Sequence, residues 1–185
     1  QGSQGMTETA RLLIDSKSEL GEGPFWHAAR QQLFWFDINE QSLFAANASG
    51  EIEDSWLFNE TVTAAAIVDE HNLVLATENG LIEFDLNVGG INRLIDIERD
   101  IEANRSNDCR VHPSGAFWIG TMVKEEGPKD GSVYHYRAGK LTKIIENVAI
   151  PNATCFSPDG KIAYFTDTPT KKILKCATDP ETGLP

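Results

Sequence analysis

The chain has 185 residues, a formal net charge of -12 at pH 7 and a sequence pI near 4.7. This length allows one domain with a sizeable hydrophobic core, and an apolar fraction of 41% is typical of a globular protein, which excludes wholesale disorder. Because no cluster of Lys or Arg offsets the acidic surface, it repels nucleic acid, and we expect no nucleic-acid partner.

The N-terminal residues show no targeting or membrane signal. We interpret residues 1–5 (QGSQG), which precede Met6, as an expression scar, and we expect the domain to occupy residues 8–185. Without a basic leader or a long apolar run, we predict no signal peptide and no membrane partner. Three cysteines without a CxxC motif argue against a disulfide framework and favour a reducing, cytoplasmic location.

Short strand-like runs follow one another along the chain. They are rich in aromatic and β-branched residues and are bounded by Gly, Asn, Asp and Pro, and no segment has a sustained helical period. A spacing of about 8–12 residues predicts an all-β sandwich, barrel or propeller. In chain order, the clearest runs are 32–38, 73–77, 81–86, 116–122, 132–138, 161–168 and 171–177.

Four segments repeat the same order of a short strand, a turn, an aromatic strand, a second turn and another strand. Their middle strands begin near Leu33, Leu73, Phe117 and Ile162, at successive offsets of 40, 44 and 45 residues. A period of about 40–45 residues with about four strands is typical of β-propeller blades, which we favour over a sandwich of similar strands. Since four blades are at the low end for a closed propeller, we expect these residues to form the first part of a longer ring.

Glu22 lies between two glycines in LGEGPFW, at the start of the first repeat. The innermost strand of every blade runs in the same direction along the central channel, so residues at the same phase surround one mouth. The residues one, two and three periods after Glu22 are Thr63, Asn107 and Asn152. We therefore predict that Glu22, Asn107 and Asn152 converge.

This carboxylate and these two carboxamides are hard oxygen donors. They suit Ca²⁺ or Mg²⁺, with water in the remaining positions, and they suit Zn²⁺ less well because no His or Cys lies at this phase. The alternative is that the three residues only cap turns at strand entrances, where Asn is common. Their agreement in phase favours a site for one divalent cation. We prefer Ca²⁺, with Zn²⁺, Mg²⁺ and Mn²⁺ as alternatives.

Two further positions lie near the predicted site. Arg105 stands two residues before Asn107, so strand alternation places both on the same side of the chain. Its guanidinium could hold a polyol or a carboxylate, or it could form an ordinary surface salt bridge. Glu125 and Glu126 follow the IGTM strand, in a loop that either contacts a ligand or is simply solvated, and their chemistry alone favours the solvated loop.

Other conspicuous residues fit structural roles. Asp37 and Asp167 occupy like positions in the first and fourth repeats, and we expect them to close turns. Four tryptophans lie in or beside strands, and we expect them to pack between blades: Trp26, Trp35, Trp56 and Trp118.

Three stretches are specific when taken together: LGEGPFW followed by LFWFDI, RSNDCRVHPSGAFWIGTM, and IPNATCFSPDGKIAYFTDT. From about Leu12 onward, the chain resembles the SMP-30/gluconolactonase/regucalcin (LRE) family of six-bladed β-propellers. The resemblance implies that the chain covers about the first four blades, as the N-terminal part of a single domain. The family often has Gly where this chain has Cys109 and Ala153, and we interpret the two small residues as a sign of tight backbone packing.

The resemblance also implies roles for the residues at matching positions. Glu22 and Asn152 match the family's metal ligands, and Arg105 and Asn107 match its substrate contacts, with Asn107 also able to touch the ion. Glu125 matches, more loosely, a position that contacts the sugar. The family's third metal ligand and general base is an Asp of the fifth blade, so we expect both beyond this chain and name no catalytic residue within it.

Similar proteins hydrolyse sugar lactones, so the resemblance implies an enzyme of the gluconolactonase type, a metal-dependent lactonase acting on a small sugar lactone. Two alternatives stay open: a regucalcin-type calcium-binding protein, and a hydrolase of phosphotriesters or other esters on the same propeller. Arg105 beside Asn107 favours an enzyme, because a calcium buffer needs no guanidinium next to its ligands. The sequence leaves the oligomeric state open.

Overall fold

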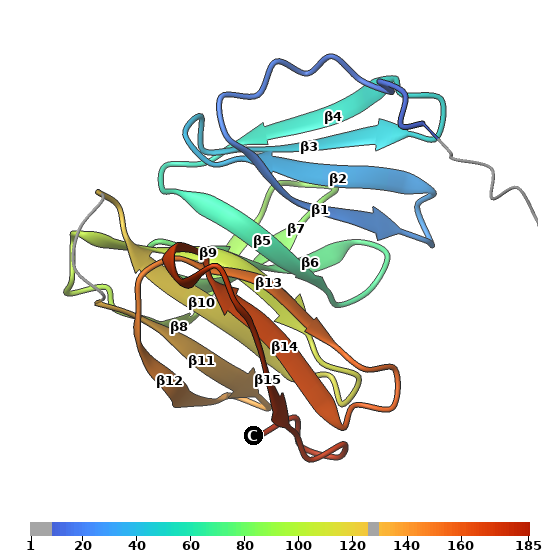
Figure 1. The fold of residues 1–185 in the computed structure, drawn as a ribbon. Coiled ribbons are helices and arrows are strands. Elements are labelled where there is room, and N and C mark those ends of the chain that lie inside the picture. The colour runs from blue at the N-terminus through green and yellow to red at the C-terminus, as the bar shows by residue number, and fades with distance from the viewer. Residues whose placement is uncertain (1–8, 126–129) are drawn as a thin grey trace, which may run out of the picture.

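The computed structural model describes residues 9–125 and 130–185, so the proposed expression scar and Glu126 lie outside the described residues. The described chain forms four antiparallel sheets, in each of which consecutive strands are neighbours. Three sheets have four strands and the last has three. The sheets follow one another as propeller blades, which confirms the predicted all-β fold (Figure 1).

Each blade runs from an inner strand beside the channel to an outer strand. Blade 1 contains β1 (Gly21–His27), β2 (Gln32–Asp37), β3 (Ser42–Asn47) and β4 (Ile52–Leu57). Blade 2 contains β5 (Val62–Ile67), β6 (Asn72–Thr77), β7 (Gly80–Asp85) and β8 (Ile91–Asp96). Blade 3 contains β9 (Asn104–Val111), β10 (Phe117–Val123), β11 (Gly131–Arg137) and β12 (Lys140–Val148). Blade 4 contains β13 (Pro151–Phe156), β14 (Ile162–Asp167), the short 3₁₀ helix η1 (Thr168–Thr170) and β15 (Ile173–Ala177).

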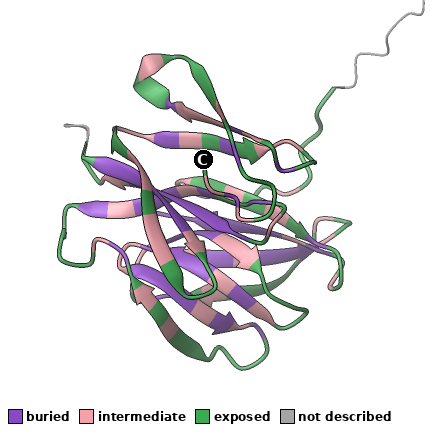
Figure 2. Cartoon of the chain, turned by 90° about the horizontal axis from the view of Figure 1, so that it is seen from below, coloured by how far each residue is buried: buried purple, intermediate pink, exposed green. Residues whose placement is uncertain are grey.

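Hydrophobic cores lie between neighbouring blades. The inner strands β1, β5, β9 and β13 pack against their neighbours in turn, and one buried cluster fills each of the three gaps between blades. Between blades 1 and 2, for example, Phe34 and Phe36 of β2 pack with Leu73 and Phe84. Figure 2 shows buried residues along the strands, and exposed residues in the turns and along parts of some strands. Since each such side chain contributes about 1.5–3 kcal/mol on burial, neighbouring blades stabilise one another.

The four tryptophans divide between two arrangements. Trp56 and Trp118 each pack edge-on against a phenylalanine of the following blade, as predicted. For Trp26 and Trp35 the interpretation stays a prediction, because strand alternation places both on the face of blade 1 that is turned away from blade 2. Trp35 stacks on an aromatic ring of its own blade, and Trp26 is 44% exposed beside the channel. Trp26 lies on the inner strand β1, whereas Trp56 and Trp118 lie on strands further out and contact the following blade.

Two histidines at the ends of inner strands connect neighbouring blades. His27 Nε2 lies 3.0 Å from the carbonyl oxygen of Asp69 in blade 2, and His112 Nε2 lies 2.9 Å from that of Gly160 in blade 4. Because a carbonyl oxygen can only accept, Nε2–H donates in both bonds. Both imidazoles are almost completely buried, so the same connection joins blade 1 to blade 2 and blade 3 to blade 4.

Asp37 and Asp167 have the predicted turn-closing role. Each carboxylate accepts hydrogen bonds from the two backbone N–H groups that precede the inner strand of its own blade, which fixes where that strand begins. The donors are Glu19 and Leu20 for Asp37, at 2.8 and 3.1 Å, and Ala149 and Ile150 for Asp167, at 3.1 and 2.9 Å.

All three cysteines are free, with Cys109 buried and Cys155 exposed. Within residues 9–125 and 130–185, no helix combines the length and the apolar character needed to cross a membrane. The cytoplasmic location stays a prediction.

Candidate functional site

Strand β1 carries Glu22 at a β-bulge. The pairing of β1 with β2 is regular from Phe25 onward but shifts between Glu22 and Phe25. Gly23, inside the bulge, has φ +58°, a left-handed conformation that glycine adopts at little cost. A Cβ at this position would also lie 2.5 Å from the carbonyl oxygen of Thr63 in blade 2. The bulge therefore requires glycine at position 23. The bulge also changes the direction of the exposed Glu22 side chain, at the start of the strand.

Strand β9 contributes Asn107, whose carboxamide has partners at both ends. Its Oδ1 accepts a hydrogen bond from Arg105 Nη1 at 2.9 Å. Its Nδ2 donates to the carbonyl oxygen of Pro151 at 2.8 Å and to Asn152 Oδ1 at 3.1 Å. Asn107 is only 8% exposed, so its bonds to blade 4 are sheltered from solvent. The predicted proximity of Asn107 and Asn152 is confirmed.

Strand β13 contributes Asn152, again at a bulge, because the pairing with β14 shifts between Asn152 and Cys155. Asn152 Nδ2 donates to Thr168 Oγ1 at 2.9 Å. Ala153, the counterpart of Gly23, is exposed and has φ +56°. The left-handed backbone by itself makes glycine favourable at this position, and the interpretation of Ala153 as a sign of tight packing stays a prediction.

Blade 2 contributes no ligand at this phase. Thr63 is 1% exposed, and its Oγ1 hydrogen-bonds to Ser106 Oγ of blade 3 at 2.7 Å. The hydroxyl pair joins the two inner strands instead of facing the channel mouth. The candidate site is thus built from blades 1, 3 and 4.

Glu22 and Arg105 interact electrostatically. Burial lowers the pKa of Arg105, and the negative charge of Glu22 opposes this shift. Arginine keeps its charge in proteins because its ordinary pKa lies far above neutral pH. The half-buried guanidinium of Arg105 on β9 therefore lies within electrostatic reach of the Glu22 carboxylate on β1.

Glu125 is exposed and lies two residues after the third blade's second strand, β10. In the described part of the chain it has no hydrogen bond or ion pair with the site residues, so its role stays a prediction, and Glu126 lies outside that part. The preceding residue, Lys124, is fixed at both ends. Its backbone N–H donates to the carbonyl oxygen of Ala103 at 2.8 Å, and its ammonium group pairs with Glu78 of blade 2.

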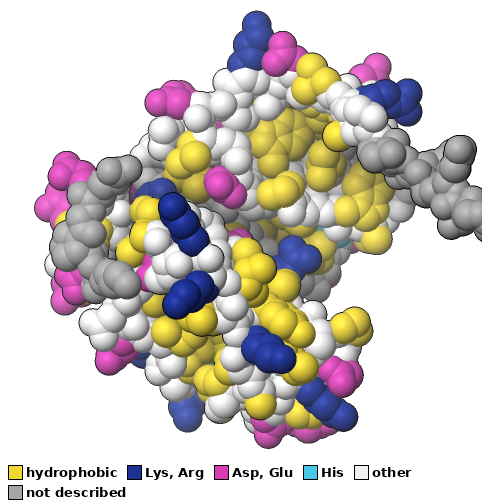
Figure 3. All heavy atoms as spheres, in the orientation of Figure 1, with side chains coloured by type: hydrophobic (Ala, Val, Ile, Leu, Met, Phe, Trp, Pro, Cys, Tyr) yellow, Lys and Arg dark blue, Asp and Glu magenta, His cyan; other side chains and the backbone are white. Residues whose placement is uncertain are grey.

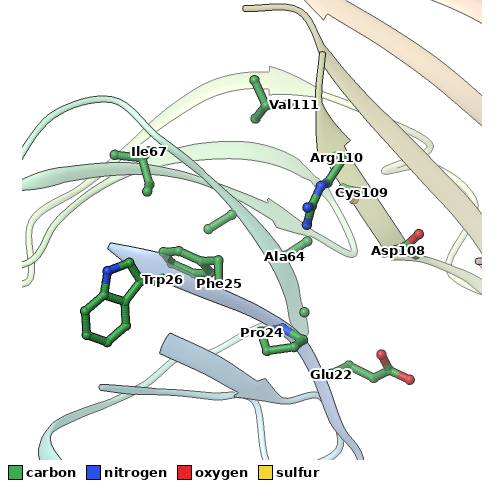
Figure 4. A pocket seen from close by; sticks show the side chains of 12 residues that line it. Glu22, Pro24, Phe25, Trp26, Ala64, Ile67, Asp108, Cys109, Arg110 and Val111 are labelled. Atoms are coloured by element: carbon green, nitrogen blue, oxygen red, sulfur yellow. The ribbon is translucent and has the colours of Figure 1, made fainter. Parts of the chain in front are cut away.

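A cavity of ≈ 590 Å³ extends along the channel from Glu22. Figure 4 shows Glu22 and Asp108 at one end of this cavity and Trp26, Ile67 and Val111 at the other. In Figure 3 the molecule is hollowed between blade 1 and blade 4, with hydrophobic side chains on the walls. Small-molecule sites have volumes of about 300–1,000 Å³, and the volume of the whole cavity lies within this range.

Two polar residues beside the site were not singled out from the sequence. Asp108 Oδ2 accepts a hydrogen bond from the backbone N–H of Thr154, at 2.7 Å, inside the bulge of β13. Burial raises the pKa of Asp108, and the bond from Thr154 opposes that shift. The position of Asp108 next to Asn107 was a possible signal. No such signal exists in the sequence for Thr168, because the stretch TDTPT is typical of an ordinary turn.

The donors in the site fit a hard cation. Glu22 offers a carboxylate, and Asn152 offers Oδ1, the kind of oxygen atoms that Ca²⁺ and Mg²⁺ prefer. Residues 9–125 and 130–185 contain no group of three or more His, Cys, Asp or Glu placed to hold a metal, unlike a structural zinc site. Two protein oxygens leave most of the coordination sphere of a hard cation to water, substrate or other ligands.

Comparison with known proteins identifies the family. Residues 20–185 match the model of the SMP-30/Gluconolactonase/LRE-like region. The chain belongs to this family. Among family members it is similar to L-arabinolactonase of Azospirillum brasilense, with 33% identity over 174 residues, covering 90% of this chain and 57% of the relative. It is also similar to 6-deoxy-6-sulfogluconolactonase of Pseudomonas putida, with 28% identity over 181 residues, covering 97% of this chain and 62% of the relative.

A solved structure gives the same result for the fold. The crystal structure of regucalcin, a calcium-binding protein from Agrobacterium tumefaciens strain C58, superposes with a TM-score of 0.87 and 39% identity. The match covers 90% of this chain and 56% of the regucalcin chain. This SMP-30/gluconolactonase chain therefore spans between 56% and 62% of the length of these three relatives.

Proposed function

We propose that the protein is a metal-dependent hydrolase that opens sugar lactones. The observation that carries this proposal is the hydrogen-bonded array of Arg105, Asn107 and Asn152, within electrostatic reach of Glu22. Family members named as lactonases support the class of reaction. The similar regucalcin is described as a calcium-binding protein, which favours Ca²⁺ over Mg²⁺, Mn²⁺ and Zn²⁺.

Glu22 and Asn152 would hold the cation through a carboxylate and Oδ1. Such a cation supplies Lewis acidity, which polarises the lactone carbonyl and stabilises the negative charge that develops on its oxygen atom. The bulge in β1 aims Glu22, and the bulge in β13 aims Asn152, so both donors are set by the backbone. The general base is expected outside these 185 residues.

Arg105 would orient the substrate. Within the described residues both of its hydrogen bonds use Nη1, so Nε and Nη2 can donate to hydroxyl or ring oxygen atoms of a lactone. Asn107 binds the guanidinium through its own Oδ1 and binds Asn152 through its own Nδ2, which keeps the substrate donors and the metal ligand in one geometry. Glu125 would contact a sugar hydroxyl from the rim.

The test uses the full-length protein freed of metal with a chelator. Hydrolysis of aldonolactones is followed with and without added Ca²⁺, Mg²⁺, Mn²⁺ or Zn²⁺, next to a paraoxon-like ester and a Ca²⁺ titration. We expect lactone hydrolysis to disappear without metal and to return with it. In Glu22→Gln we expect kcat to fall by about 100-fold or more, because a group that stabilises the transition state through the metal is lost. Glu19→Gln removes the same charge from a nearby exposed residue and serves as the control.

Three outcomes would contradict the proposal. Lactone hydrolysis that survives complete removal of metal would exclude metal dependence. Hydrolysis of the paraoxon-like ester without any lactone would point to an esterase of another kind. Tight Ca²⁺ binding without hydrolysis of any substrate would point to a calcium-binding protein.

A further inference from the structure

The side chains of the site form a directional chain of hydrogen bonds. Arg105 donates to Asn107 Oδ1, Asn107 Nδ2 donates to Asn152 Oδ1, and Asn152 Nδ2 donates to Thr168 Oγ1, at 2.9, 3.1 and 2.9 Å. A carboxamide has an oxygen that only accepts and an amino group that only donates. The direction of each bond therefore decides which way each amide faces.

The direction of this chain is fixed at its first two members. Arg105 has no acceptor, so Asn107 must turn Oδ1 toward it. The carbonyl oxygen of Pro151 has no donor, so the Asn107 amino group must face blade 4. Asn107 then presents an N–H donor to Asn152, and Asn152 can accept this hydrogen bond only with Oδ1. Two independent partners thus set the orientation of Asn107, and Asn107 sets that of Asn152.

Thr168 completes the chain from the opposite side. With Oδ1 of Asn152 turned toward Asn107, the amino group of Asn152 faces Thr168, whose hydroxyl oxygen accepts its hydrogen bond. A rotated Asn152 would place two amino groups against each other and lose that bond. Only Oδ1 can bind a hard cation, so the same orientation that satisfies Thr168 presents the metal-binding atom.

The hydroxyl of Thr168 is held in place by the backbone. Thr168 begins η1 directly after β14, and its N–H donates to the carbonyl oxygen of Ile150 at 3.0 Å, at the start of β13. The N–H of Lys171 donates back to the carbonyl oxygen of Thr168 at 3.2 Å. These bonds fix the distance between the hydroxyl and the strand that carries Asn152.

We propose that Thr168 is a positioning residue for Asn152: its hydroxyl accepts the Asn152 amide and keeps Oδ1 facing the cation. This inference rests on the proposed function, because it assumes that Asn152 is a metal ligand. Outer-shell partners of metal ligands change metal affinity by about 10–100-fold when they are replaced. The role belongs to the hydroxyl and not to the volume of the side chain.

The variants separate these two properties in the full-length protein. Thr168→Val keeps the shape and removes the acceptor, whereas Thr168→Ser keeps the acceptor. Thr166→Val is the matched control, because Thr166 lies on β14 opposite Asn152 but its hydroxyl donates to the carbonyl oxygen of Lys172, at 2.6 Å. Calorimetric titration of Ca²⁺ into the metal-free protein gives the first readout. We expect Kd to rise about 10–100-fold in Thr168→Val and to stay within a few-fold of wild type in the other two.

The second readout needs no metal. Side-chain amide signals of Asn107 and Asn152 are compared by ¹H–¹⁵N NMR in the metal-free wild type and in Thr168→Val. We expect the Asn152 signal to move and its exchange with solvent to speed up. An unchanged Asn152 signal, or a changed signal with unchanged Ca²⁺ affinity, would overturn the role of Thr168. If the wild type binds no divalent cation, the metal-dependent function fails and the positioning role fails with it, while the NMR comparison still shows whether the hydrogen bond exists.

Discussion

The two ends of the channel are built from the same inner strands but differ in chemistry. At the end where the strands begin, Asn107 and Asn152 join blades 3 and 4 by directed hydrogen bonds. At the other end, Trp26, Ile67 and Val111 are 44%, 46% and 39% exposed and offer apolar surface. Position along an inner strand therefore separates a polar, ordered end from an apolar one.

The backbone differs between the two ends in the same way. Each inner strand has a shift in its pairing register near the polar end and regular pairing near the apolar end. A bulge re-aims a side chain at the expense of regular pairing, and bulges are common next to active sites. In this fold, therefore, the pairing of the inner strands is irregular at the end of the channel where polar side chains are directed into the site.

The largest expected effect comes from breaking the polar end at its centre. Asn107→Leu keeps the size of the side chain but removes the hydrogen bond from Arg105 Nη1 and the donor to the Pro151 carbonyl. We expect kcat/KM for lactone hydrolysis to fall by about 100-fold or more, because both Arg105 and Asn152 lose their alignment. The free energy of unfolding should fall by about 1–3 kcal/mol, the cost of an unsatisfied buried polar group. Steady-state kinetics and urea unfolding of the full-length protein measure both.

Val111→Ser on the same strand is the control for the apolar end. It changes an apolar side chain but touches no hydrogen bond of the site. We expect kcat/KM within about twofold of wild type, as for substitutions away from such features. An equal loss of activity in both variants would show that the two ends do not differ in function.

The second effect concerns the bulge that carries Glu22. Gly23→Ala combines a left-handed φ with a close approach to the Thr63 carbonyl oxygen. We expect the free energy of unfolding to fall by about 2 kcal/mol or more. Gly139→Ala is the matched control, since Gly139 has φ +78° but nothing within 4 Å of an added Cβ. Urea unfolding measures both, and an equal loss in the two variants would show that the contact with blade 2 costs nothing.

A smaller effect, of opposite sign, is expected at the equivalent position of blade 4. Ala153→Gly relieves the left-handed strain of about 1–2 kcal/mol and adds the greater flexibility of glycine in the unfolded chain. The net stabilisation should be about 0.5–1 kcal/mol, measured by thermal or urea unfolding. A destabilised Ala153→Gly would mean that the alanine side chain contributes packing that its exposure does not suggest.

The sequence predicted the parts of the site that follow from the repeat. Asn107 and Asn152 are one blade period apart, and in a propeller that spacing alone places them at one end of the channel. Thr63 has the same phase, but its hydroxyl is buried against Ser106, because phase gives the position of a residue and not the direction of its side chain.

Other parts of the site depend on information that spacing does not contain. Thr168 directly follows β14 and contacts Asn152 near the start of β13. Its role therefore depends on the register of these two strands and on the direction of a hydrogen bond. Ala153 was interpreted from its size, and the sequence does not show the positive φ that makes glycine favourable there. Trp26 was assigned to blade packing from its residue type, and its position beside the cavity was not predicted.

The smallest effect concerns the ion pair that joins blades 2 and 3 above the polar end. Burial acts to raise the pKa of Glu78, but hydrogen bonds from Lys124 and from the backbone N–H of Thr61, at 2.9 Å, outweigh it, and the pKa lies below its ordinary value of 4.5. A carboxyl group with a lowered pKa stabilises the folded state above its ordinary pKa, and this contribution disappears as the pH falls through the lowered value.

Glu78→Gln should therefore be less stable than wild type at pH 7, by less than about 1 kcal/mol because solvent screens the pair. Urea unfolding of both proteins from pH 7 to pH 3 measures this difference. The difference should shrink toward acid pH, and a difference that grows would mean that Glu78 stabilises the fold as a neutral acid.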